Sequence, residues 1–135
     1  MKRPAVPSGS SGGPLDASRP ARFSRTHRLS RTWQYQRTYR EGRSTRGKLV
    51  VLFAHVAPGE PSRLGIVASK KVGGAVVRNR TKRRLREVGR ALWPRVRPDG
   101  RQLVVIALAV AAQAPFADLI ADVEALFASS GALAS

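Results

Sequence analysis

The sequence predicts a single α+β domain in which helices pack on a small sheet. Two kinds of pattern predict it: short apolar, β-rich runs, and stretches in which apolar residues recur at helical spacing. Their order along the chain is helix, strands, helix, strand, helix. A length of 135 residues suits one such domain with a tail.

In the first half, residues 28–40 indicate a short helix for which Thr32 is a candidate N-cap. Lys48–Ala57 is nearly continuous apolar sequence, which is typical of a strand covered on both faces. A turn at Pro58–Ser62 and a second strand at Leu64–Ser69 follow. The two runs and the turn between them predict a hairpin.

In the second half, a helix around Arg78–Arg86 should end near Trp93, because Pro94 restricts the residue before it. Leu103–Val110 predicts a buried strand, and Pro115 suits the first position of a last helix. That helix carries an apolar stripe for the core, made of Phe116, Leu119, Ile120, Val123, Leu126 and Phe127. Its acids, Asp118, Asp122 and Glu124, should point outward.

Charge is the strongest signal in the composition. The chain carries 25 Lys and Arg against 8 Asp and Glu, a net charge of +17. This excess predicts a nucleic-acid partner, with an anionic membrane surface as the weaker alternative. Residues 99–135 hold only one of the basic residues, so we expect that third to be scaffold. Because the sequence has no cysteine, no visible signal peptide and no long apolar run, the expected location is the cytoplasm.

The helix around Arg78–Arg86 has two distinct sides. At about 100° per residue, an apolar stripe is formed by Thr81, Leu85, Val88 and Leu92. A separate basic face is formed by Asn79, Lys82, Arg83, Arg86 and Arg90. A solvated helix usually mixes charges of both signs, whereas this one places like charges side by side, which favours a polyanion partner. Asn79 is a candidate N-cap or a candidate phosphate contact.

Three aromatic residues allow two interpretations. Tyr35 and Tyr39 share one helix face, and they are either core anchors or a stacking platform for unpaired bases. Phe53 reads as core from the strand pattern alone, on the same strand face as Val51. Trp33 falls on the opposite side of its helix from Tyr35 and is not assigned to the platform.

No arrangement of residues indicates protein-based catalysis. The acids are scattered, and the two histidines, His27 and His55, are far apart in sequence. We therefore expect an RNA binder with no catalytic residue and no metal ligand. A structural or ribosomal RNA-binding protein and a stand-alone nuclease remain the alternatives.

The stretch SKKVGGAVVRNRTKRRLRE, residues 69–87, resembles the signature of the protein subunit of bacterial ribonuclease P. The resemblance extends from about Arg28 to about Ser129. It implies a two-layer sandwich of order αβββαβα on a four-stranded sheet, with a left-handed βαβ crossover. It also implies that residues 48–69 hold two short strands, or one bent strand, before a third. The expected organisation is a disordered tail at 1–24, the domain at 25–130 and a disordered end at 131–135.

In that family the RNA subunit, with Mg²⁺, removes the 5′ leader of precursor tRNA, and the protein holds the leader and broadens the substrate range. The resemblance implies that Mg²⁺ is held by the RNA and that the protein does not oligomerise. The residues expected to face RNA are Lys70, Lys71, Arg78, Asn79, Lys82, Arg83, Arg86 and Arg90. The residues expected to line the leader cleft are Tyr35, Tyr39 and Phe53.

Overall fold

The computed structural model describes residues 25–134, so the tail expected to be disordered at 1–24 lies outside the described residues. Three α-helices and four strands follow one another in the predicted order αβββαβα. The α-helices are α1 (Thr32–Glu41), α2 (Ala75–Leu92) and α3 (Phe116–Ser129). The strands are β1 (Arg43–Arg46), β2 (Val50–Pro61), β3 (Arg63–Val67) and β4 (Asp99–Ala107). Short 3-10 helices are η2 (Arg25–His27), η3 (Trp93–Arg95) and η4 (Ala109–Gln113).

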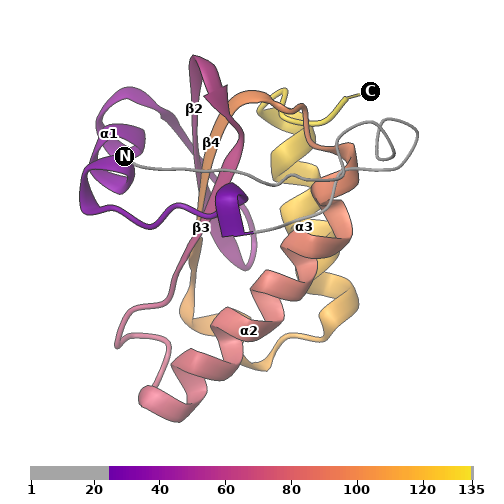
Figure 1. Cartoon of the computed structure of the whole chain (residues 1–135). Helices are drawn as coiled ribbons and strands as arrows, with labels where there is room; N and C mark the ends of the chain where they lie inside the picture. Colours follow the sequence, from indigo (N-terminus) through magenta and orange to yellow (C-terminus); the bar gives the residue numbers. More distant parts are fainter. Residues whose placement is uncertain (1–24, 135) are drawn as a thin grey trace.

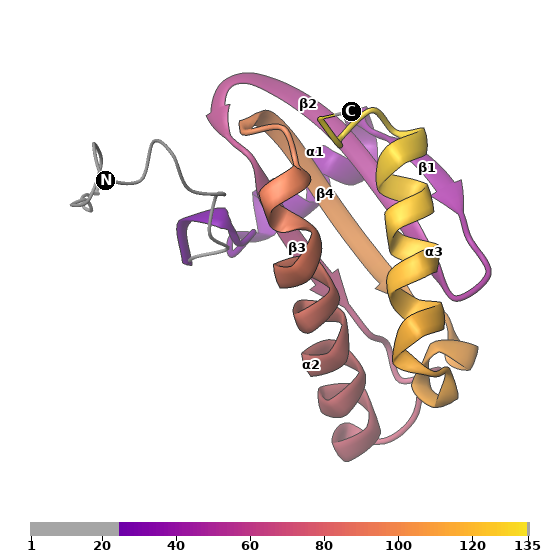
Figure 2. The same cartoon turned by 90° about the vertical axis from the view of Figure 1, so that its right-hand side faces the viewer.

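The strands form one sheet in the order β1-β2-β4-β3. β3 runs parallel to β4, and the other neighbours are antiparallel. Helices α2 and α3 lie side by side on one face of the sheet, and α1 lies on the opposite face (Figures 1 and 2). The predicted α+β class, element order and four-stranded sheet are confirmed. The left hand of the β3-α2-β4 crossover stays a prediction.

The main core lies between the sheet and the pair α2 and α3. From β2 and β4 it takes Val50, Leu52, Leu103 and Val105, which are almost fully buried. From α2 it takes the predicted stripe of Thr81, Leu85, Val88 and Leu92, each of which is buried. The one polar member, Thr81, donates its hydroxyl to Val77 O at 2.8 Å. The helical period therefore predicted correctly which side of α2 packs on the sheet.

The strand predictions were wrong in three respects. β1 occupies the polar segment Arg43–Arg46, where no strand was expected, and it pairs with β2. β2 continues through the predicted turn at Pro58–Ser62 as far as Pro61, with an irregularity after Val56. The predicted hairpin between β2 and β3 does not form, because β4 lies between them. The pattern of apolar residues indicates which residues are buried, but it does not determine which strands pair with one another.

The helix starts also differ from the predictions. α1 begins at Thr32, after Arg28 has formed a bridge with Leu64, so Thr32 is the first helical residue and not the cap. The backbone N–H groups of Ser30 and Arg31 donate to Gln34 Oε1 at 2.9 and 3.0 Å, and this side chain closes the helix start. α2 begins at Ala75, after Gly74 as N-cap. Asn79 therefore lies inside the helix and does not cap it.

The C-terminal part needs four corrections. β4 spans Asp99–Ala107 instead of 103–110, and Pro115 is the N-cap of α3 and not its first residue. Phe116, expected in the core, is 42% exposed. Asp122, expected to point outward, accepts hydrogen bonds from backbone N–H groups at the turn between β1 and β2.

A further correction concerns the residues after α3, which were expected to be disordered. Leu133 forms an antiparallel bridge with Val96, and Ala132 accepts a hydrogen bond from Arg97 N at 2.7 Å. Ala132 and Leu133 are buried in the main core. The N–H of Ala134 also donates to Arg95 O at 2.8 Å, so the ordered domain extends past α3 as far as residue 134.

Candidate nucleic-acid interface

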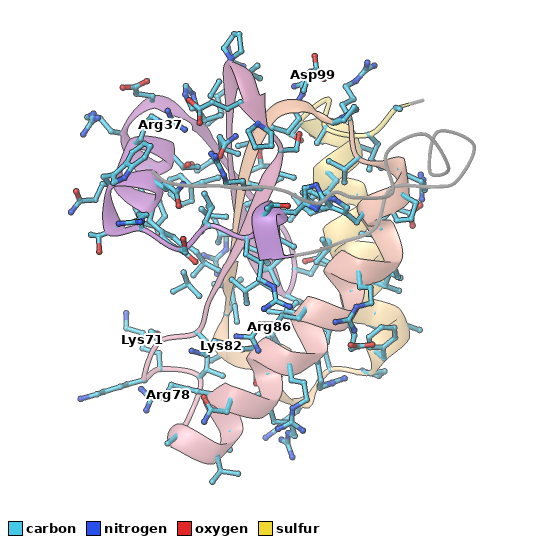
Figure 3. The ribbon with its side chains drawn as sticks, viewed as in Figure 1. Arg37, Lys71, Arg78, Lys82, Arg86 and Asp99 are labelled. Atoms are coloured by element: carbon cyan, nitrogen blue, oxygen red, sulfur yellow. The ribbon has the colours of Figure 1, made fainter. Side chains whose placement is uncertain are left out.

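The predicted basic residues lie along α2 and the loop before it. Lys71, Arg78, Lys82 and Arg86 lie on the flank of α2 that faces away from α3 (Figure 3). We call the following set the basic ridge: Lys70, Lys71, Arg78, Asn79, Lys82, Arg83 and Arg86. Arg78 and Lys82 are half-buried, and the other members are exposed.

Within residues 25–134, carboxylates do not neutralise the positive charge at the centre of the ridge. In the part of the chain that the structure describes, Arg78, Lys82, Arg83 and Arg86 form no ion pair with a carboxylate. Arg90 differs, because it pairs with Glu87 on the next turn. Like charges on one flank repel one another. Binding of an anion there is therefore favoured twice, because the anion is attracted to the cations and also reduces the repulsion between them.

Another face of α2 serves the fold. Arg84 donates a hydrogen bond to Ala114 O, which fastens α2 to the segment before α3. Arg80 is exposed. Helical spacing places both residues away from the core stripe and from the basic face, and Arg84 has a structural partner there.

The loop between β3 and α2 exposes its two lysines. Val72 is buried and donates its N–H to Ser69 O at 3.0 Å, and Gly73 donates to Lys70 O at 3.2 Å. Gly73 has a φ of 152°, a conformation that side chains rarely adopt. This turn holds Lys70 and Lys71 at the start of α2.

The three aromatic residues predicted for the leader cleft come together between α1 and the sheet. The rings of Tyr39 and Phe53 meet edge to face, with 5.0 Å between their centroids. Tyr35 lies against Gly65, and its hydroxyl donates to Leu29 O at 3.2 Å. Phe53, Val104 and Gly65 are neighbours across β2, β4 and β3, so one row of the sheet carries both tyrosines. We call Tyr35, Tyr39 and Phe53 the aromatic face.

Next to this row the sheet is open. The following row consists of Val51, Ile106 and Val67, which pair with one another and are all half-buried. Strand alternation correctly placed Val51 on the face of Phe53, but the strand was expected to be covered on both sides. α1 covers only part of this face (Figure 1), so apolar surface remains accessible beside the aromatic face.

The basic ridge and the aromatic face adjoin at Tyr35 and Arg86. Both residues line a pocket of about 110 Å³, together with residues of β3 and the segment before α1. The pKa of Tyr35 is raised mainly by burial and also by Tyr39, against a lowering by the positive charge of Arg86. Burial likewise raises the pKa of Tyr39. Both phenols therefore stay neutral at physiological pH.

One element of the site was not predicted: an ion-pair cluster that holds α1 in place. Arg37 donates to both carboxylate oxygens of Glu60 at 2.8 Å, and Arg63 donates to the same carboxylate at 3.0 Å. The hydrogen bond from Arg37, with help from Arg63, lowers the pKa of Glu60 to about 2. Charge-assisted bidentate pairs of this kind fix geometry as well as adding energy. The cluster ties α1 to the ends of β2 and β3.

No candidate metal centre occurs in residues 25–134, since no group of three or more His, Asp or Glu side chains is placed to hold an ion. His55 lies 3.7 Å from Glu41, its nearest acidic partner. Among the same residues, no helix is both long and apolar enough to span a membrane.

The fold and the site together define a small α+β protein whose cationic helix flank adjoins an aromatic surface on a partly open sheet. The Ribonuclease P family model matches residues 23–130. The chain belongs to the ribonuclease P protein family.

Relatives of known family agree with this assignment. The ribonuclease P protein component of Symbiobacterium thermophilum is 49% identical over 96 residues, which cover 69% of this chain and 81% of that protein. The protein component of Kocuria rhizophila is 45% identical over 91 residues, covering 67% and 80%. The structure of the Staphylococcus aureus RNase P protein superposes with a TM-score of 0.71 at 26% identity, covering 80% of this chain and 98% of that one. The RNase P protein of Thermotoga maritima gives a TM-score of 0.65 at 29% identity, covering 73% and 93%.

Proposed function

We propose that the basic ridge docks on the catalytic RNA of ribonuclease P, while the aromatic face holds the unpaired 5′ leader of precursor tRNA beside it. Family membership makes the chain a protein component of a tRNA-processing endoribonuclease. Within that complex we assign the protein to binding, and the cleavage step to the RNA subunit and its Mg²⁺. Arg90 was among the predicted contacts, but Glu87 already pairs with it, and we leave it outside the basic ridge.

The observation that carries the proposal is the meeting of Tyr35, Tyr39 and Phe53 on one row of the sheet, with Arg86 at its end. Unpaired bases stack on aromatic rings with little sequence preference, and nearby arginines neutralise the phosphates between the bases. A surface of this kind suits leaders of varied sequence. A mature tRNA has no 5′ leader, so it has no leader bases to stack on this surface.

The cations of the ridge would also change the metal requirement. Two RNA molecules that approach one another concentrate phosphate charge, and bound Mg²⁺ or protein cations both reduce the repulsion. We therefore expect the protein to matter most when Mg²⁺ is scarce. In this proposal Mg²⁺ is held by the RNA and is not a ligand of the protein.

Reconstitution tests the proposal. The full chain is added to the RNA subunit of the same organism at low Mg²⁺, and cleavage of precursor tRNA is followed by gel electrophoresis. We expect the protein to restore cleavage that the RNA alone does not perform at that Mg²⁺ concentration. Absence of stimulation at every Mg²⁺ concentration would refute the proposed role.

A second comparison tests the aromatic face. Replacing Tyr39 and Phe53 by alanine should weaken binding of leader-bearing precursor by about tenfold or more, since each stacked base contributes about 1–3 kcal/mol. Binding of mature tRNA should not change. Equal losses for both RNAs would assign these residues to general stability instead of leader binding.

A further inference from the structure

Trp33 is an aromatic side chain that the aromatic face does not include. It lies in the first turn of α1 and is 53% exposed, whereas the other tryptophan, Trp93, is 2% exposed. Helical geometry places Trp33 about 200° from Tyr35, on the outward side of α1. About half of the ring surface is therefore outside the protein core and open to a ligand.

One face of the Trp33 ring is already prepared for stacking. The guanidinium of Arg37 lies over the ring, 5.1 Å from its centroid. Arg37 is not free to move away, because it donates to both carboxylate oxygens of Glu60. Figure 3 shows Arg37 on α1, far from Lys82 and Arg86 of the basic ridge. The pair Trp33 and Arg37 is therefore a rigid cation–π unit on a different side of the molecule.

We propose that Trp33 is a second stacking site, which takes one unpaired RNA base on the ring face opposite Arg37. The inference rests on the proposed RNA-holding function and extends it to the outward side of α1. Charge favours this occupant, because α1 and its N-cap carry Arg31, Arg37 and Arg40 against one acid of the helix, Glu41. Arg37 is paired with Glu60, and Arg40 lies 3.5 Å from Glu41. The indole backed by the guanidinium therefore supplies the stacking surface, and the exposed Arg31 at the helix start supplies a cation for the adjoining phosphate.

A purely structural role for Trp33 predicts different behaviour. In that case the indole would only cover the aliphatic stem of Arg37, and its loss would affect stability without affecting RNA. The two tryptophans allow the two roles to be separated by fluorescence. Only Trp33 is accessible to a neutral quencher such as acrylamide, because Trp93 is buried.

The experiment titrates the full chain with a short oligouridine and, in parallel, with a blunt-ended RNA duplex of the same length. Stacking on Trp33 should quench its emission and protect it from acrylamide when oligouridine binds. The duplex should do neither, because all of its bases are paired. Oligouridine binding without protection of Trp33 would overturn the inference.

Three variants complete the test, with affinity measured by anisotropy of labelled oligouridine. Trp33→Ala should raise the Kd about tenfold, the loss expected for one stacked base. Trp33→Phe keeps a ring and should recover most of the affinity. Phe116→Ala removes another exposed aromatic residue, on α3, and should leave the Kd unchanged.

An unchanged Kd for Trp33→Ala, together with a lowered melting temperature, would assign the residue to stability and overturn the inference. The proposed function would survive that result, since cleavage of precursor tRNA and the Tyr39 and Phe53 variants test it separately. If oligouridine does not bind the native chain and the protein also fails to stimulate cleavage, both are refuted.

Discussion

The ring of Tyr35 fills the space that a side chain at position 65 would need. A Cβ atom built on Gly65 would lie 2.6 Å from Cε1 of Tyr35, closer than such atoms approach in proteins. Gly65 does not have a positive φ, so the glycine matters for close approach and not for backbone conformation. Because glycine has no side chain, Gly65 on β3 leaves the space in which Tyr35 of the aromatic face lies.

Replacing Gly65 by alanine should therefore displace Tyr35 and destabilise the fold. Overpacking a close contact typically costs about 1–3 kcal/mol, and urea unfolding would measure it. Binding of leader-bearing precursor should weaken as well. Gly74→Ala is the control for added volume, because nothing lies within 4 Å of a Cβ atom there, and its cost is limited to the change of N-cap, about 1 kcal/mol or less. A Gly65→Ala variant as stable as the native chain would show that Tyr35 moves without cost.

The ion pair of Arg37 and Glu60 predicts how stability depends on pH. The pKa of Glu60 is lowered from 4.5 to about 2 in the folded state, so this carboxylate stabilises the fold fully above its unfolded value. As the pH falls from about 4.5 towards 2, the unfolded chain takes up the proton first, and the contribution is lost.

The measurement compares the native chain with Glu60→Gln by urea unfolding between pH 6 and pH 2. The native chain should be more stable at pH 6, and the difference should shrink steadily below about pH 4.5. Glu124→Gln is the control, since its partner Arg95 is about half exposed and such pairs contribute little. A difference that does not vary with pH would contradict the assignment.

Periodicity predicted α2 correctly because its burial is one-sided. Thr81, Leu85, Val88 and Leu92 recur at helical spacing, and each of them packs in the core. Strand pairing was not predictable in the same way. The polar segment Arg43–Arg46 becomes a strand only because β2 offers it an unpaired edge. By contrast, the parallel pairing of β3 with β4 was expected, because a strand, a helix and a second strand in this order predict a βαβ unit.

The site was predictable residue by residue but not as an assembly. Helical spacing placed Tyr35 and Tyr39 on one face, and strand alternation placed Phe53 with Val51. The meeting of the two groups depends on how α1 packs on the sheet, and Glu60 helps to set this packing from the far end of β2. A single acid in a loop-like sequence gave no signal of that role.

Asp122 was also expected to point outward into solvent. Its contacts in the structure predict that replacing it lowers the free energy of unfolding substantially. Its carboxylate accepts hydrogen bonds from the N–H groups of Lys48, Leu49 and Val50 at 3.0, 2.9 and 3.2 Å. Asp122→Ala should cost about 2–3 kcal/mol, because hydrogen bonds to a charged acceptor are lost and partly buried donors stay unpaired.

Asp122→Asn keeps one acceptor oxygen and should lose less stability than alanine in the same urea unfolding experiment. Asp118→Ala, on the exposed first turn of α3, should cost about 0.3–1 kcal/mol through the helix dipole. RNA affinity of the folded variants should be unchanged. If Asp122→Ala were as stable as Asp118→Ala, the turn between β1 and β2 would not depend on this carboxylate.

The basic ridge predicts how RNA binding depends on salt. Each phosphate neutralised by the protein releases counterions, and this contributes about 0.7–0.9 to the slope of log K against log salt. Arg83 and Arg86 are exposed and unpaired within the described part of the chain, so replacing both by alanine should weaken binding of the RNA subunit. It should also reduce the slope by about one to two units.

The matched control removes the same charge elsewhere. Arg95 pairs with Glu124, and Arg97 donates to Gly131 O at 3.2 Å, so neither belongs to the ridge. Arg95→Ala with Arg97→Ala should leave the slope nearly unchanged, because these residues already have partners in the protein. Affinity would be measured by filter binding over a range of KCl concentrations. The same slope change in both double variants would mean that net charge, and not the position of α2, governs binding.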